Sequence, residues 1–127
     1  SSTAGDGFAA LFTHAVTADR TYTLPDATGT VALGEGAKAW ANVSVTPALN
    51  DSYNVTSVAD GGVGVVTIVI DTDFTNANYA PVVTTTEGGS RIISVSSLAT
   101  TGFTVNIFDN AGGAIDVAFA MIAFGDQ

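Results

Sequence analysis

The 127-residue chain contains no cysteine, and Arg20, Lys38 and Arg91 are its only lysine or arginine residues. Without thiols it can form neither a disulfide framework nor a thiolate metal site. Twelve acidic residues give a net charge of −9. Binding to nucleic acid or to an anionic membrane surface needs clustered positive side chains instead. We therefore expect no nucleic-acid partner.

Long apolar runs are also lacking. No run reaches the roughly 18 residues of a transmembrane helix, so we expect no membrane insertion. The first residues, SSTAGDG, lack the basic start and apolar stretch of a secretory signal and read as an internal cut in a longer chain. Only 12% of residues are charged and 46% are hydrophobic, which predicts apolar burial between subunits or a surface rich in Thr, Ser, Asn and Gly.

Helical periodicity is almost absent, whereas β-branched and aromatic residues alternate with turn residues, a pattern typical of strands. In FTVNIF, Phe103, Val105 and Ile107 face one way and Thr104 and Asn106 the other. IDVAFAMIAF and VGVVTIVI are apolar on both faces, so we expect central or subunit-covered strands there. The expected strands cover residues 8–14, 20–24, 29–33, 37–46, 52–59, 63–70, 79–86, 90–98, 102–108 and 114–124.

The sequence predicts an all-β protein in two parts. Residues 1–36 offer three short strands and no room for a core, so we expect a β-hairpin shaft or linker segment whose apolar side chains are covered from outside. Residues 37–127 carry hairpin turns between strands of sandwich length, such as Asp60-Gly61-Gly62. Seven strands at this spacing predict an antiparallel β-sandwich.

The motifs of the chain resemble those of bacteriophage fibres. Residues 17–33, TADRTYTLPDATGTVAL, resemble a unit common in tail-fibre and other structural proteins of tailed bacteriophages. The remainder is similar to a C-terminal domain of phage fibres in the order of its motifs, which are KAWANVSV (38–45), DSYNVTSVADGG (51–62), NANYAPVV (76–83) and VAFAMIAFG (117–125). Residues 45–49 depart from the Asn-Gly-Thr-Gly pattern of that family, so this loop should differ in shape.

The resemblance implies a non-enzymatic virion appendage, a tail fibre or a head fibre, that is most often a homotrimer. The expected localisation is the virion, assembled in the bacterial host cytoplasm. The expected partners are other copies of the chain, capsid or tail proteins, and a glycan or protein on the host surface. Attachment to the host is the expected role. A capsid decoration or cement protein that stabilises the head is the alternative that stays open.

The residues offer little for catalysis. His14 is the only histidine, so no Ser/His/Asp triad can be assembled. Asp71 and Asp73 stand two apart, as in a carboxylate pair or a Ca²⁺ site, but a solvated strand end is the simpler interpretation. GGVGVV, residues 61–66, lacks the Lys-Ser/Thr ending of a phosphate-binding loop. We predict no enzyme activity, no cofactor and no metal site.

The low charge and the coreless first segment predict subunit contacts. Arg20, Tyr22 and Leu24 share one strand face, where the Arg fork can bond carbonyls or a carboxylate of a neighbouring chain. A solvent-exposed Arg is the alternative. Trp40, the sole tryptophan, is expected in the core or at the interface, and Phe119 is expected at the interface. Alternatively, the aromatic ring of Trp40 or Tyr79 could stack on a sugar ring.

A receptor would be bound by loops at the end of the sandwich far from the first segment. Alternate turns of a sandwich project to one end, and binding residues concentrate on loops held by a rigid scaffold. Our candidates are Thr86 and Glu87 in residues 85–89, and Asp109 and Asn110 in residues 109–113. Plain hairpin turns are the alternative interpretation.

Overall fold

The computed structural model describes residues 36–127. The predicted shaft segment, with Arg20, Tyr22, Leu24 and His14, therefore lies outside the described residues. The described part consists of eight strands and their connections and contains no helix. Within residues 36–127 nothing resembles a helix long and apolar enough to cross a membrane.

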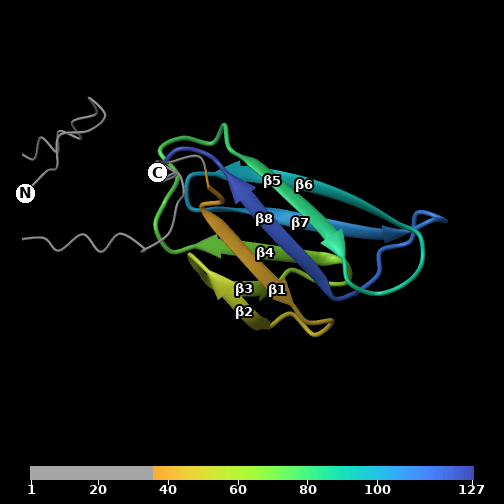
Figure 1. Cartoon of the computed structure of the whole chain (residues 1–127). Coiled ribbons are helices and arrows are strands. Elements are labelled where there is room, and N and C mark those ends of the chain that lie inside the picture. Colours follow the sequence, from red (N-terminus) through yellow and green to blue (C-terminus); the bar gives the residue numbers. More distant parts are fainter. Residues whose placement is uncertain (1–35) are drawn as a thin grey trace, which may run out of the picture. The chain divides into compact units, whose positions relative to one another are not determined.

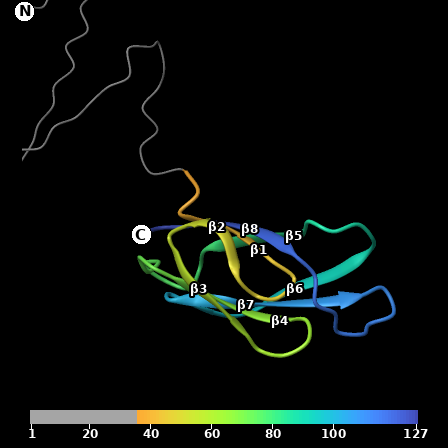
Figure 2. The ribbon, with the colours of Figure 1, turned by 90° about the horizontal axis from the view of Figure 1, so that it is seen from below.

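The strands form two antiparallel four-stranded sheets that lie face to face (Figures 1 and 2). The all-β class is confirmed, and the arrangement is that of a β-sandwich. Sheet A has the order β2-β1-β8-β5 and sheet B the order β3-β4-β7-β6. Sheet A contains β1 (Ala39–Val43), β2 (Leu49–Tyr53), β5 (Ala80–Thr85) and β8 (Phe119–Phe124); sheet B contains β3 (Val55–Asp60), β4 (Val65–Ile70), β6 (Arg91–Ala99) and β7 (Gly102–Asp109).

The core lies between the two sheets, and side-chain alternation explains its membership. Phe103, Val105 and Ile107 of β7 point inward and are almost completely buried, as their alternation predicts. From sheet A, β1 and β8 contribute their inward-facing residues. Apart from Tyr79, no residue with a polar or charged side chain among residues 36–127 is buried. The main core residues are Ala39, Ala41, Val43, Val66, Ile68, Phe74, Tyr79, Phe103, Val105, Ile107, Phe119, Met121 and Ala123.

Both strands predicted to be central are central, β4 in sheet B and β8 in sheet A. Within the single chain the inner face of β8 is buried, whereas Phe124 on its outer face is 42% exposed. The strand also begins at Phe119 rather than at residue 114. The preceding segment stays with sheet B, since Gly64 N donates to the Asp116 carboxylate over 2.7 Å and Ile115 N to the Ile107 carbonyl.

The single strand predicted for residues 52–59 is in fact two strands in different sheets. The break is at Asn54, whose φ of 56° lies in the left-handed region. There the Asn54 side chain replaces the missing ladder bonds: its Oδ1 accepts from Thr72 N at 2.6 Å, and its Nδ2 donates to the Lys38 carbonyl at 2.9 Å. The sandwich therefore has eight strands rather than seven.

Of the two residues expected at subunit contacts in this part of the chain, Phe119 lies in the core, whereas Trp40 lies on the outer side of a sheet. Phe119 is 0% exposed and is packed between the two sheets of its own chain. Another subunit cannot reach its side chain, so its assignment to an interface is wrong. Trp40 is not in the core, because it alternates with the inward-facing Ala39 and Ala41 and therefore projects from the outer side of sheet A.

Candidate functional site

A row of apolar side chains crosses the outer side of sheet A from edge to edge. The strand register pairs Trp40 with Tyr53 on one side and with Ile122 on the other, and Ile122 in turn with Val82. Residues directly opposite each other in antiparallel strands share a face. Phe124, one step further along β8, lies on the same face and is paired with Ala80. We call the apolar part of this side the outer face of sheet A: Tyr53, Trp40, Ile122, Val82, Phe124, Ala80 and Ala120. The row that contains Ala120 also holds the polar residues Asp51, Asn42 and Thr84.

Much of this face is in contact with solvent. The exposed fractions are 38% for Trp40, 58% for Tyr53, 56% for Val82 and 42% for Phe124. Given the full areas of such side chains, these four expose about 400 Å², which is in the range of functional patches on monomers. Covering that area is worth roughly 10 kcal/mol before the costs of association are subtracted. The face is therefore large enough to matter for binding.

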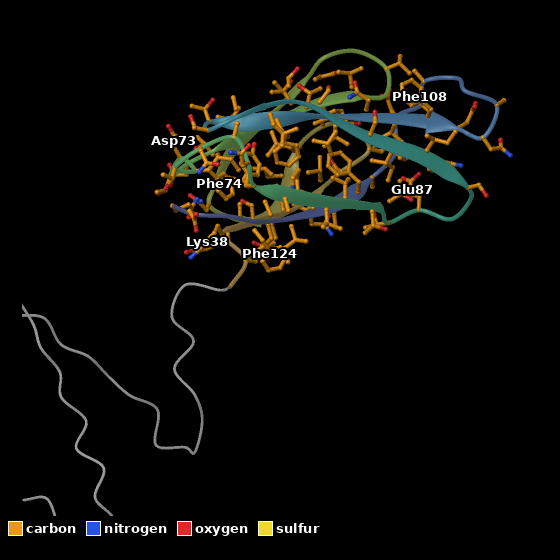
Figure 3. The ribbon with its side chains drawn as sticks, turned by 90° about the horizontal axis from the view of Figure 1, so that it is seen from above. Lys38, Asp73, Phe74, Glu87, Phe108 and Phe124 are labelled. Atoms are coloured by element: carbon orange, nitrogen blue, oxygen red, sulfur yellow. The ribbon has the colours of Figure 1, made fainter. Side chains whose placement is uncertain are left out.

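The centre of the outer face of sheet A carries no charge. Lys38 lies beside Phe124 at the end where the chain enters β1 (Figure 3), and Asp51 lies on edge strand β2. The other acidic groups of residues 36–127 are at the two ends of the sandwich. Those near Lys38 are Asp71, Asp73 and Asp126, and those at the opposite end are Asp60, Glu87, Asp109 and Asp116.

The outer side of sheet B is mostly polar in comparison. Its central rows pair Ser94 with Asn106 and Ser96 with Thr104, and Thr104 is paired with Thr67. Asn106 Nδ2 donates to Ser96 Oγ at 2.9 Å. The large exposed apolar side chains of β6 are Ile92 and Leu98, near the two ends of that strand. The two sides of the sandwich therefore differ in chemistry, and only sheet A presents an apolar row across all of its strands.

The two loops chosen as receptor candidates lie at one end of the sandwich, as predicted. Glu87 and Phe108 are at the end opposite Lys38 (Figure 3). The loop at residues 85–89 bonds the segment that follows the other loop: Thr86 N donates to the Ala118 carbonyl at 3.0 Å, and Ala118 N to the Glu87 carboxylate at 3.4 Å. Their binding to a receptor stays a prediction.

The four candidate side chains differ in how they are used. Asp109 Oδ1 accepts hydrogen bonds from Ala111 N and Gly113 N, each at 2.9 Å. This carboxylate therefore stabilises the turn at residues 109–113. Thr86 and Asn110 are exposed. Among residues 36–127, no group of three acidic, histidine or cysteine side chains is placed to hold a metal ion. Asp71 and Asp73 are exposed near Lys38, at the other end.

Tyr79 and Asn54 have structural roles that the sequence reasoning missed. The Tyr79 ring is 5% exposed and stacks on Phe74 with ring centroids 4.0 Å apart, so a sugar could not reach its face. Its hydroxyl lies 2.8 Å from the Gly102 carbonyl. Burial raises the pKa of Tyr79, while a hydrogen bond to the backbone at Ala99 lowers it by less. The sequence signals that could have indicated these structural roles are the motif NANYA, which contains Tyr79, and the motif SYNVTS, which contains Asn54.

Searches with the sequence and with the structure find no matching protein family, no matching curated protein and no matching solved structure. The functional interpretation therefore depends on the geometry of the chain and on the resemblance of its motifs.

Proposed function

We propose that this chain is the C-terminal part of a bacteriophage fibre, a tail fibre or a head fibre, that attaches the particle to a host surface. Residues 1–36 form a β-hairpin shaft segment and residues 37–127 the terminal sandwich, assembled as a homotrimer. The chain acts by binding rather than by catalysis, and its partners are capsid or tail proteins at one side and a host glycan or protein at the other.

The observation that carries the proposal is how the fibre-like motifs are used in the fold. Asn54 of SYNVTS donates to the Lys38 carbonyl of KAW at 2.9 Å and also binds Thr72. Tyr79 of NANYA bonds the turn between β6 and β7. The bonds of these segments, which are scattered along the sequence, thus lie at one end of a single sandwich. This is what one would expect if the motif pattern encoded one structural module.

The opposite end of the sandwich fits the role of a recognition surface. Its loops carry short polar side chains, with Thr86 and Asn110 exposed, and rest on a rigid two-sheet scaffold. Hydroxyl, amide and free backbone groups of this kind can form hydrogen bonds with sugar hydroxyls. The supporting observation is that the structural bonds of Asn54 and Tyr79 lie away from this end.

A capsid decoration protein is the second candidate. The apolar outer face of sheet A supports it, because a cement protein needs a large surface that is buried on the particle. The two candidate functions differ in which surface of the chain stays exposed on the particle. A fibre exposes the loops at residues 85–89 and 109–113, whereas a cement protein is held flat against the capsid and does not compete with the particle for its host.

The test combines location with competition. Electron cryo-microscopy of the phage that encodes the chain should place its density at the end of a projecting fibre. The purified chain, added to host cells before the phage, should slow adsorption in proportion to its concentration. The control is heat-denatured chain. Density spread over the capsid surface, together with unchanged adsorption, would favour the cement protein instead.

A further inference from the structure

The geometry points to the outer face of sheet A as the surface on which copies of this chain assemble: we propose that three such faces pack against one another around a common axis. The inference rests on the proposed function only in that it takes the assembly to be a homotrimer. It adds the face, the residues and their order around the axis.

The charge of the chain indicates that another copy of the chain covers the outer face of sheet A. A chain with a net charge of −9 repels its own copies, and that repulsion is least where two surfaces without charge meet. The row Tyr53, Trp40, Ile122 and Val82 is such a surface. A strongly basic partner would instead be expected to bind the acidic ends of the sandwich, which lie outside this row. An uncharged apolar face therefore suits association between like chains.

The area of the face is in keeping with an interface between subunits. The four most exposed side chains supply about 400 Å², roughly half of what one partner contributes to a standard interface. Ile122, Ala120 and the stem of Lys38 extend the same surface. Two of its residues are Trp and Tyr, the types enriched at the centres of interfaces. A polar face such as that of sheet B has no comparable reason to be covered.

The strand order predicts which residues of neighbouring copies are in contact. Because β1 and β8 are in the middle of sheet A, Trp40 and Ile122 would lie nearest the axis. β2 and β5 are the edges, so Tyr53 of one chain would approach Val82 of the next. This contact is heterologous and closes after three steps, as a ring requires.

The first experiment uses the absence of native cysteine. The full chain carrying both Tyr53→Cys and Val82→Cys should be linked by a short bis-maleimide into covalent trimers on a denaturing gel. Either single variant should stop at traces of dimer. The matched control is Ala59→Cys with Ser96→Cys, which takes the two edges of one row of sheet B. It should give no linked chains.

The second experiment uses Trp40, the only tryptophan, as a reporter. In the assembled full chain its emission should be blue-shifted and shielded from acrylamide. Ile122→Glu would place three carboxylates near the axis and should weaken assembly at least ~10-fold, which corresponds to ~1.4 kcal/mol. Thr67→Glu, at the centre of the outer side of sheet B, should leave assembly unchanged. Circular dichroism checks that both variants keep the β fold.

Two results would overturn the inference. One is a wild-type chain that is monomeric at micromolar concentration by light scattering. The other is a trimer in which Trp40 is freely quenched and the sheet B pair is linked as well as the sheet A pair. Neither result decides the virion role, which depends on where the protein lies on the particle and on competition for the host.

Discussion

The hydroxyl oxygen of Tyr79 lies 2.8 Å from the carbonyl oxygen of Gly102 and 3.0 Å from that of Ala99, at the turn between β6 and β7. Tyr79 directly precedes β5 of sheet A, while both carbonyls belong to sheet B. One phenolic proton therefore serves two acceptors and ties the sheets together. At Gly102 the backbone φ of 152° brings the chain close to the Ile68 carbonyl, where a side chain would collide.

Tyr79→Phe should lower the free energy of unfolding by about 1–2 kcal/mol, because it leaves two carbonyls without this donor while the ring packing is kept. Urea unfolding followed by circular dichroism measures the change. Tyr53→Phe is the matched control, since Tyr53 is 58% exposed. If the two variants unfold at the same urea concentration, the Tyr79 hydroxyl does not link the sheets energetically.

The same residue predicts a loss of stability in alkali. Burial raises the pKa of Tyr79 in the folded chain above its ordinary value of 10.0. Its contribution to stability is therefore fully present below pH ~10 and is lost as the pH rises through the raised value. Urea unfolding at pH 8 and at pH 11 should show a drop that is smaller in Tyr79→Phe. An equal drop in both proteins would assign the effect to other groups.

Asn54→Ala should cost about 2–3 kcal/mol of unfolding free energy. The variant loses the amide bonds to Lys38 and Thr72 and must still adopt a positive φ. Asn54→Gly separates the two effects, since glycine accepts this φ but has no amide, and it should cost less than alanine. Equal losses for the two variants would show that backbone strain at this position is negligible.

The alternation of FTVNIF was sufficient to predict strand β7 and its inward side, since only one face of that strand is apolar. The break at Asn54 was missed because its neighbours are strand formers, and only the tolerance of Asn for positive φ hints at a crossover. The outer face of sheet A could not be predicted. Trp40, Tyr53 and Val82 come from three different strands, and their row exists only once the strand order is known.

Phe119→Ala should lower the free energy of unfolding by about 3–5 kcal/mol, because it opens a cavity between the sheets at a residue that is 0% exposed. Ile92→Ala is the control: it removes an apolar side chain that is 53% exposed on edge strand β6, and should cost less than about 1 kcal/mol. Thermal unfolding compares them. A small effect at Phe119 would mean that the core can collapse around the loss.

The double variant Thr86→Ala with Asn110→Ala tests the recognition end. Both side chains are exposed, so stability should stay within about 0.5 kcal/mol. If they contact a host receptor, the purified variant should need ~10-fold more protein to slow phage adsorption, equivalent to ~1.4 kcal/mol of binding. Asp73→Asn with Thr101→Ala, exposed at the opposite end, is the matched control and should compete like the wild type.

Asp109→Ala separates loop shape from direct contact in the same assay. Its carboxylate accepts from Ala111 N and Gly113 N, so its loss should loosen residues 109–113 and cost about 1 kcal/mol of stability. Weaker competition by this variant alone would mean that the turn matters through its backbone. Undiminished competition by both variants would remove these loops from the receptor surface. Weight would then shift to the cement-protein candidate, for which these loops need no contact with the host.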